Sequence, residues 1–399
     1  MRVLEEERGK GRDDYPIRAV WNSLLAGIVF QHPTIESLIR ELPRNGQLRE
    51  CCGFQPGAVP PPSVYTRFLQ HLLDHESVLD QRFDDLVEAL RTALPHFAER
   101  LAIDGKALPS FAQNPNKNQT PDGRRDLDAD HGVKPYHGKN KDGKPWEKIV
   151  HGFGYKIHLL VDSTDAWPLA FTVTQASVAD ITEAPVLLAP MAKRHPLALK
   201  AARVLSGDKG YDSRPRVTEL WDDYQIKPVI DIRNLWKDGE ISPGLPGYAN
   251  VTYDYQGVVE CYDPATGIKR TMANGGFEPD RSTLKKVCPV DVSGGVCEGA
   301  EECPVKHQLR IQLDTDHRIF TPIDRASYRW KQEYQARTAV ERVNSRLDVS
   351  FGFEWHTIRG LKKMRLRCGL ALVVMLAMAL GRIRANQADQ LRSLVRPAI

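Results

Sequence analysis

Two short apolar runs, each ending in an aspartate close to a glycine, constrain the fold of this chain most. They are RLAIDGK at residues 100–106 and RVLSGDKG at residues 203–210. Such a run is typical of a strand buried in a sheet, and it delivers a polar residue to the carboxyl-terminal edge of that sheet. We therefore expect Asp104 and Asp208 to follow two strands of one sheet. Taken singly, an aspartate after a strand more often only begins a turn.

A third acid lies far downstream, in the stretch KQEYQARTAVERVNSRLD at residues 331–348. Wound as a helix at about 100° per residue, this stretch places Tyr334, Arg337, Glu341 and Asp348 on one face. The apolar residues Ala336, Val340, Val343 and Leu347 fall on the opposite face, which would pack against a core. The alternative interpretation is a solvated face with an Arg337–Glu341 ion pair.

Three carboxylates on two strands and a helix can meet around hard cations. Magnesium prefers oxygen ligands, commonly one or two carboxylates together with substrate phosphate and water. Two such ions roughly 3.5–4 Å apart can activate the attacking oxygen and stabilise the leaving oxygen of an in-line phosphodiester displacement. The combination predicts phosphodiester chemistry in which water or a DNA 3′-hydroxyl attacks.

The remaining stretches indicate how the chain is organised. Residues 17–98 have helical periodicity, with Thr34 and Ser63 as candidate caps. Residues 113–148 are polar and rich in glycine, proline, asparagine and lysine, which predicts a long mobile loop, and its run HGKNKDGKPWEK could touch phosphates. GYKIHLLVD, WPLAFTVTQA and IKPVIDIR predict further strands. Residues 234–317 lack helical periodicity and predict an irregular, β-rich insertion.

Composition fits a soluble globular protein. The chain has 399 residues, 41% hydrophobic and 27% charged, with a net charge of +4 that is compatible with nucleic acid without demanding it. The charged N-terminus has no apolar signal-peptide core, and the apolar run at residues 368–381 is shorter than the roughly 20 residues of a membrane span, so we expect a buried helix there. Seven cysteines, an odd number, favour a reducing cytoplasm over a disulfide scaffold.

Four of the cysteines fall in the β-rich insertion. Cys261, Cys288, Cys297 and Cys303 are enough for one tetrahedral structural zinc ion, although no pair has the CxxC spacing of strong zinc motifs. Free buried thiols are the alternative interpretation.

These motifs resemble those of bacterial insertion-sequence transposases that have a DDE catalytic domain of the RNase H-like fold. AIDGKAL is similar to the first-acid motif, GYKIHLLVD with PLAFTVTQASVAD to the hairpin that follows, and GDKGYDS to the second-acid motif. Tyr334, Arg337 and Glu341 match the Y-x2-R-x3-E spacing of the third motif. TIRGLKK and the N-terminal RELPRNGQLRECCGF extend the resemblance over nearly the whole chain.

The resemblance implies an α/β fold: an RNase H-like mixed sheet flanked by helices, interrupted by a β-rich insertion and preceded by an α-helical N-terminal domain. Accordingly we expect a helical DNA-binding or dimerisation domain at residues 1–98. The catalytic domain would occupy residues 99–233 and resume at residues 318–399 with the Glu-bearing helix and a C-terminal helix. Residues 234–317, with the four cysteines, would form the insertion.

The resemblance also implies roles for single residues. Asp104, Asp208 and Glu341 would be the catalytic ligands of two Mg²⁺ or Mn²⁺ ions. Tyr334 and Arg337 would hold the DNA phosphate near the scissile bond.

One position departs from the family pattern. The family signature ends with a lysine seven residues after the glutamate, where this chain has Asp348. Either Lys209 or Arg346 makes the missing contact to the DNA backbone, or the contact is absent. As a further acid on the same face, Asp348 would repel DNA.

The resemblance implies a DNA transposase that cleaves at the terminal inverted repeats of an insertion sequence and transfers the strand into target DNA. Its partners would be double-stranded DNA and a second copy of itself, as a homodimer on DNA, with no membrane. We expect it in the bacterial cytoplasm, associated with the nucleoid when bound. The alternatives are an RNase H-like DNA nuclease without strand transfer and a catalytically inactive DNA-binding derivative.

Overall fold

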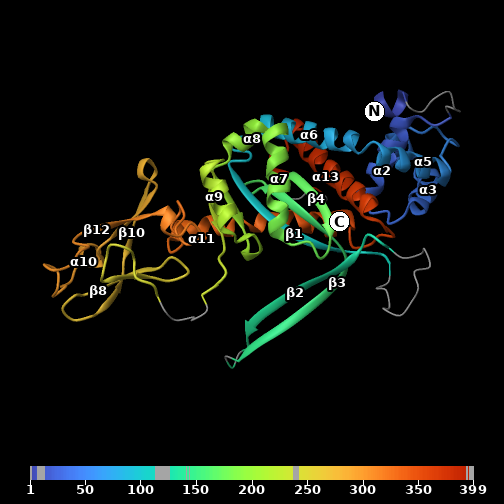
Figure 1. Cartoon of the computed structure of the whole chain (residues 1–399). Helices are drawn as coiled ribbons and strands as arrows, with labels where there is room; N and C mark the ends of the chain where they lie inside the picture. The colour runs from blue at the N-terminus through green and yellow to red at the C-terminus, as the bar shows by residue number, and fades with distance from the viewer. Residues whose placement is uncertain are drawn as a thin grey trace. The chain divides into compact units, whose positions relative to one another are not determined.

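The computed structural model describes residues 2–6, 14–112, 126–140, 142, 144–236, 242–391 and 394 (Figure 1). The chain divides into two compact units. Unit 1 consists of residues 1–97, 105–196 and 339–399, and unit 2 of residues 98–104 and 197–338. Strand β1 (Arg100–Pro109) contributes its first half to unit 2 and its second half to unit 1.

The main sheet has six strands in the order β2-β3-β1-β5-β6, with β4 paired to β3. Its other strands are β2 (Asp130–Lys139), β3 (Pro145–Asp162), β4 (Trp167–Gln175), β5 (Val204–Gly207) and β6 (Lys227–Ile230). β5 runs parallel to β1 and to β6, whereas β3 runs antiparallel to β2 and β4. A mixed sheet with helices, preceded by N-terminal helices, confirms the expected α/β class.

Unit 1 begins with helices, and all but the first of them lie within residues 17–98, which the sequence predicted to be helical. They are α1 (Arg2–Glu6), α2 (Ile17–Val29), α3 (Ile35–Arg44), α4 (Gly46–Cys52), α5 (Pro62–Asp74) and α6 (Glu76–Ala93). Thr34 caps α3, since its side chain accepts from the Ser37 backbone N–H. The prediction that Ser63 caps the next helix is wrong. α5 begins at Pro62, whose missing N–H and fixed φ suit the first turn of a helix.

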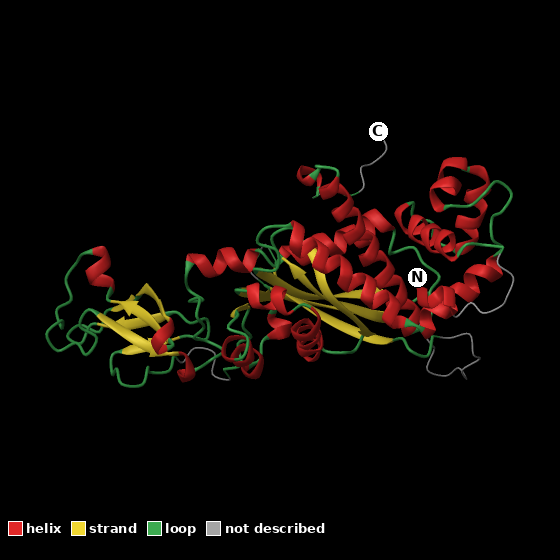
Figure 2. Cartoon of the chain, turned by 90° about the horizontal axis from the view of Figure 1, so that it is seen from above, coloured by secondary structure: helices red, strands yellow, loops and turns green. Residues whose placement is uncertain are grey.

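The C-terminal part of unit 1 contains one long apolar helix, α13 (Leu361–Arg384), which contacts α6, α2 and β4. Its length and composition would suffice to cross a membrane, but 67% of its most apolar window is buried inside the protein, as in the core helix of a soluble domain. The expected burial of residues 368–381 is therefore largely found. Shorter elements of this unit are α7 (Asp180–Arg194), α12 (Thr338–Ser345), η4 (Arg346–Ser350) and η5 (Ala388–Gln390). Figure 2 draws the helices red and the strands yellow.

The predicted loop at residues 113–148 is in part a β-ribbon, so that prediction is wrong for most of the described stretch. Residues 113–125 lie outside the described part of the chain. Beyond them, β2 pairs antiparallel with residues 145–154 of β3, from Asp130 opposite Gly154 to Lys139 opposite Pro145. Lysines, prolines and glycines hid the alternation by which sequence reasoning recognises strands.

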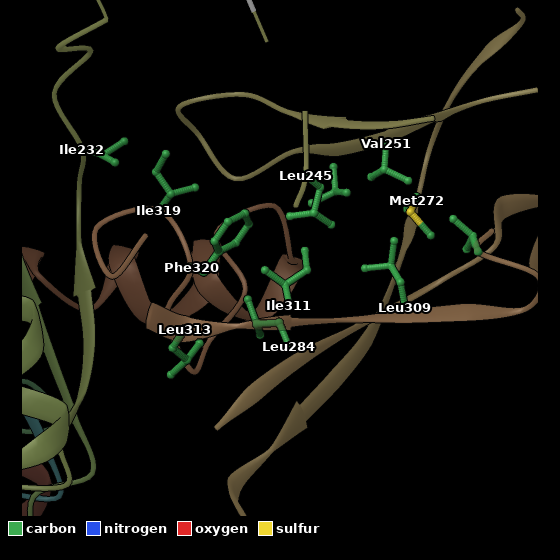
Figure 3. Packing of buried hydrophobic residues seen from close by; sticks show 12 residues of the cluster. Ile232, Leu245, Val251, Met272, Leu284, Leu309, Ile311, Leu313, Ile319 and Phe320 are labelled. Atoms are coloured by element: carbon green, nitrogen blue, oxygen red, sulfur yellow. The ribbon is translucent and has the colours of Figure 1, made fainter. Parts of the chain in front are cut away.

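Unit 2 carries β5, β6 and the first half of β1, together with the β-rich region. Its helical elements are α8 (Pro196–Ala201), η1 (Lys209–Tyr211), α9 (Arg214–Asp222), η2 (Pro279–Arg281), α10 (Pro289–Ser293), η3 (Leu313–Thr315) and α11 (Tyr328–Gln335). Two three-stranded antiparallel sheets form the β-rich region, β7 (Val251–Tyr253), β8 (Val259–Tyr262) and β9 (Lys269–Thr271), and β10 (Ala273–Glu278), β11 (Thr283–Val287) and β12 (Gln308–Gln312). A shared apolar cluster packs them together, including Val251, Met272, Ile311 and Phe320 (Figure 3).

The sequence predicted one continuous helix at residues 331–348, and this prediction is wrong. α11 ends at Gln335, a turn follows at residues 336–337, and α12 begins at Thr338. In the turn, the backbone N–H of Arg337 donates to the Tyr334 carbonyl at 3.1 Å, three residues back, so the chain is wound more tightly than an α-helix. The last residues form a π-helical turn, η4. The single polar face drawn from a 100° rotation therefore does not hold across the whole stretch.

Candidate active site

Asp104 and Asp208 lie at the same end of the segment over which two adjacent parallel strands pair. Within unit 2, β1 and β5 pair in register from Arg100 opposite Val204 to Ile103 opposite Gly207. Asp208 directly follows β5, whereas the expectation that Asp104 follows a strand is wrong, because β1 continues to Pro109 and Asp104 is its next residue after this pairing. Paired parallel strands lie about 4.8 Å apart. Both side chains are partly exposed. The structure thus brings together the two acids that the sequence singled out upstream.

The turn after β5 fixes the Asp208 carboxylate. Its Oδ1 accepts from the Gly210 backbone N–H at 2.7 Å, which caps the short helix η1. Asp212, the other aspartate of the GDKGYDS motif, has a structural role. Asp212 is buried and accepts from the Arg318 guanidinium, with Nη2 at 2.5 Å and Nε at 3.1 Å. Asp212 therefore fastens the loop after β5 instead of facing a substrate.

Arg337 is bound to the first acid. Its Nη1 lies 2.6 Å from Asp104 Oδ2, and the two side chains are 20% and 16% exposed. The same guanidinium lies over the Tyr334 ring at 5.8 Å, and that ring stacks on Trp330 with 4.9 Å between centroids. Burial raises the pKa of Tyr334, with the charge of Asp231 adding to the effect, so the phenol is a neutral hydrogen-bonding group.

A third aspartate at this edge escaped the sequence reasoning. β6 pairs in parallel with β5, with Gly207 opposite Ile230, and the backbone N–H of Asp231 donates to the Gly207 carbonyl at 3.1 Å. The signal was present, because Asp231 also directly follows an apolar strand, KPVI. Lys209, 62% exposed, lies 3.7 Å from Asp231 through its Nζ. Asp208 and Asp231 thus directly follow β5 and β6, and Asp104 lies within β1 just after its parallel pairing with β5.

Glu341 belongs to unit 1. It lies exposed in the first turn of α12, whereas Ala339, Val340 and Val343 on the other side of that helix are buried. A carboxylate in the first turn also interacts favourably with the helix dipole. Its meeting with Asp104 and Asp208 stays a prediction.

Asp348, the position that departs from the family pattern, forms an ion pair with Lys106, which the sequence did not predict. Within unit 1, Lys106 Nζ lies 2.5 Å from Asp348 Oδ2, with the side chains 22% and 20% exposed. The positive charge of Lys106 offsets the negative charge of Asp348, which the sequence predicted to repel DNA. Arg346 is no substitute for a DNA contact. It is buried, with its guanidinium 4.1 Å from the centre of the Trp167 ring and bonded to the Ala166 carbonyl. Lys209 is exposed enough for that contact.

The aspartate pair suits a divalent cation. Mg²⁺ takes one or two protein carboxylates and completes its shell with water and substrate phosphate. The guanidinium on Asp104 shows that a positive charge already fits at this carboxylate. Within the residues that the structure describes, no three histidine, cysteine, aspartate or glutamate side chains form a group that could hold a metal ion. The pair at the sheet edge is thus the part of the predicted ligand set that the fold assembles.

The four cysteines of the β-rich region remain free thiols. Burial raises the pKa of Cys261 to about 11, and the charges of Cys288, Cys303 and Cys297 add to that effect. Two of them have other partners: the Cys297 thiol bonds to Asp263, and Cys303 Sγ accepts from the Asn250 side chain at 3.4 Å. The zinc site stays a prediction.

The sequence profile of a family described as "Transposase DDE domain" matches residues 96–377, which covers the main sheet, the β-rich region and most of α13. A search of curated proteins found no match.

Proposed function

The chain belongs to the transposases with a DDE domain, and we propose that it cleaves DNA at the terminal inverted repeats of an insertion sequence and joins the ends to target DNA. Membership carries transposase activity, a phosphoryl transfer on DNA that depends on divalent metal ions. The observation that supports the proposal best is that Asp104 and Asp208 each come directly after the last residue pair of the in-register β1–β5 pairing. Adjacent carboxylates at one edge are what in-line phosphodiester chemistry needs from a protein.

In this proposal Asp104, Asp208 and Glu341 hold two divalent ions. When bound, the ions activate the attacking oxygen and stabilise the leaving oxygen. The protein's own contribution is to orient its acids. The bond from Gly210 N–H fixes one oxygen of Asp208, and the strand register sets Asp104 beside it.

Arg337, Tyr334 and Lys209 are the proposed phosphate-binding residues. A guanidinium is suited to phosphate because its planar fork of donors can contact two oxygens. Arg337 bonds Asp104 in the free protein, so it must exchange that carboxylate for a DNA phosphate. The Tyr334 hydroxyl is held in position by stacking on Trp330.

Larger-scale features complete the proposal. Residues 1–98 would bind DNA or dimerise, residues 234–317 would be an insertion within the catalytic domain, and two chains would hold two element ends together. The protein would act in the bacterial cytoplasm, on the nucleoid.

The decisive experiment is a nicking assay on a labelled duplex that carries a terminal repeat, with Mg²⁺ or Mn²⁺. We expect Asp208→Asn and Glu341→Gln to abolish cleavage. Asp223→Asn, which changes an exposed aspartate after α9, should cleave at the parent rate. If Asp208→Asn or Glu341→Gln cleaves as fast as the parent, the assignment of these acids is wrong.

Two further measurements separate the alternatives. A plasmid integration assay that yields cleaved but never joined ends would favour a nuclease without strand transfer. Calorimetric titration of DNA-bound protein with Mg²⁺ that shows no binding would favour an inactive DNA-binding derivative.

The zinc hypothesis has its own test. Elemental analysis of the purified protein should find about one zinc per chain if the four cysteines bind it. The double change Cys288→Ser with Cys303→Ser should then remove it. Absence of zinc from protein purified without chelators would leave Cys261 and its neighbours as plain thiols.

A further inference from the structure

The ribbon formed by β2 and residues 145–154 of β3 is anchored to the rest of unit 1 at its base. At its base, Asp130 accepts from the Ser177 backbone N–H at 2.9 Å, and β3 continues beyond Gly154 into its pairing with β4. Further out, residues 145–152 pair with β2 and are all exposed. Figure 1 shows β2 and β3 as a long two-stranded ribbon.

The ribbon exposes apolar side chains to water, which is unfavourable for a two-stranded hairpin without a partner. A two-stranded hairpin is only marginally stable in water. Nevertheless Val133, Ile149 and Val150 are 59%, 51% and 40% exposed. Trp146 is 44% exposed, and its indole lies across Gly138, where an added Cβ would come within 2.5 Å of the ring. These features favour a surface that is completed by a partner.

Charge indicates the kind of partner. Between residues 133 and 151 the sequence has five lysines against two acids, Asp142 and Glu147, a difference of +3 in a chain whose net charge is +4. Two copies of such a ribbon would repel each other, whereas a polyanion would be attracted. Lys144 and Lys148 are exposed, and Lys148 lies on the same face of β3 as Trp146, two residues away.

We propose that this ribbon is a DNA-binding arm, in which Lys144 and Lys148 contact backbone phosphates of a duplex. A two-stranded β-ribbon fits the major groove of B-DNA, and lysines on it would bind phosphates without reading sequence. The proposal rests on the proposed function for the presence of a DNA substrate. It adds a DNA-binding surface in unit 1 to which Asp104 and Asp208, residues of unit 2, do not belong.

Binding is measured by fluorescence anisotropy with a labelled duplex of arbitrary sequence. The protein carries Asp208→Asn so that no cleavage occurs. Adding Lys144→Ala and Lys148→Ala should weaken binding on the order of tenfold at about 0.15 M salt. The slope of log K against log salt should become shallower by about 1.8, since each lost phosphate contact removes about 0.9.

A matched control removes the same charge elsewhere. Lys193 and Lys200 are exposed lysines on α7 and α8, and changing both to alanine should leave affinity and slope at the parent values. The arm is refuted if the ribbon variant binds like this control. It is equally refuted if the ribbon variant alters only sedimentation, because the occupant would then be a second copy of the chain.

The outcome is independent of cleavage. Loss of DNA affinity in the ribbon variant supports the arm even if the parent neither cuts nor joins DNA, in which case only the proposed function fails. Normal binding by the ribbon variant, in a chain whose parent transposes, refutes the arm alone.

Discussion

Replacing Arg337 with glutamine removes the cation that holds the first acid. Arg337 Nη1 is 2.6 Å from Asp104 Oδ2, and both side chains are at most one-fifth exposed. A charge-assisted hydrogen bond of this kind contributes about 1.5–3 kcal/mol. We expect Arg337→Gln to lower the free energy of unfolding of the metal-free protein by about 2 kcal/mol.

The same change should strengthen metal binding. In the free protein the guanidinium occupies the carboxylate that we propose as a metal ligand, so an incoming cation must displace it. Without the Arg337 guanidinium, metal binding no longer has to break the ion pair, so it becomes more favourable by the free energy that the pair contributed. At about 1.4 kcal/mol for each factor of ten, 2 kcal/mol corresponds to roughly 30-fold tighter binding.

The measurement is a titration of DNA-free protein with Mn²⁺, followed by electron paramagnetic resonance of the unbound ion, alongside thermal unfolding with and without Mn²⁺. The matched control is Arg203→Gln, which removes an exposed arginine 3.6 Å from Glu99 and should change neither quantity. Mn²⁺ affinity that stays constant or falls in Arg337→Gln would refute the competition. Arg337 would then orient Asp104 instead of masking it.

Three further outcomes follow from contacts elsewhere in the two units. Lys106→Ala should lower the free energy of unfolding by about 1 kcal/mol because Asp348 loses its partner at 2.5 Å. Adding Asp348→Asn should restore part of that stability. An unchanged urea midpoint in Lys106→Ala would contradict the prediction. Asp212→Asn should cost about 3 kcal/mol in urea unfolding, since it takes the buried carboxylate from Arg318, and a loss below about 1 kcal/mol would show that the pair is dispensable. Burial lowers the pKa of His158 from 6.5 to about 4, so the unfolded chain binds more protons in that range. Stability should therefore fall by up to about 3 kcal/mol as pH drops from 6.5 to 4, and a pH profile that His158→Gln does not flatten would exclude this cause.

The sequence predicted the parts of the fold that depend on local pattern. Apolar runs marked β1, β5 and β6 because each is buried, and the register of neighbouring parallel strands then places Asp104 beside Asp208. Thr34 was recognisable because a cap depends only on the following three residues.

What the sequence did not predict depends on contacts between distant residues. Lys106 and Asp348 are 242 positions apart, and the residues next to either one in the sequence do not predict their ion pair. The turn at Arg337 interrupts a stretch whose periodicity is helical throughout, and it coincides with the ion pair to Asp104. The ribbon was missed because its pairing partner, and not its composition, makes β2 a strand.

Asp104 within β1, Asp208 after β5 and Asp231 after β6 explain why metal and DNA binding should be coupled. Like charges on adjacent strands repel, and the free protein relieves this with its own donors: Arg337 on Asp104, the Gly210 N–H on Asp208 and Lys209 near Asp231. A divalent ion on the aspartates would take over the neutralising task and release the two cationic side chains to phosphates. Because coupling between two binding equilibria is reciprocal, Mn²⁺ should raise DNA affinity by the same factor by which DNA raises Mn²⁺ affinity. That factor should be smaller in Arg337→Gln, since this variant has no guanidinium that can leave Asp104 and bind a DNA phosphate.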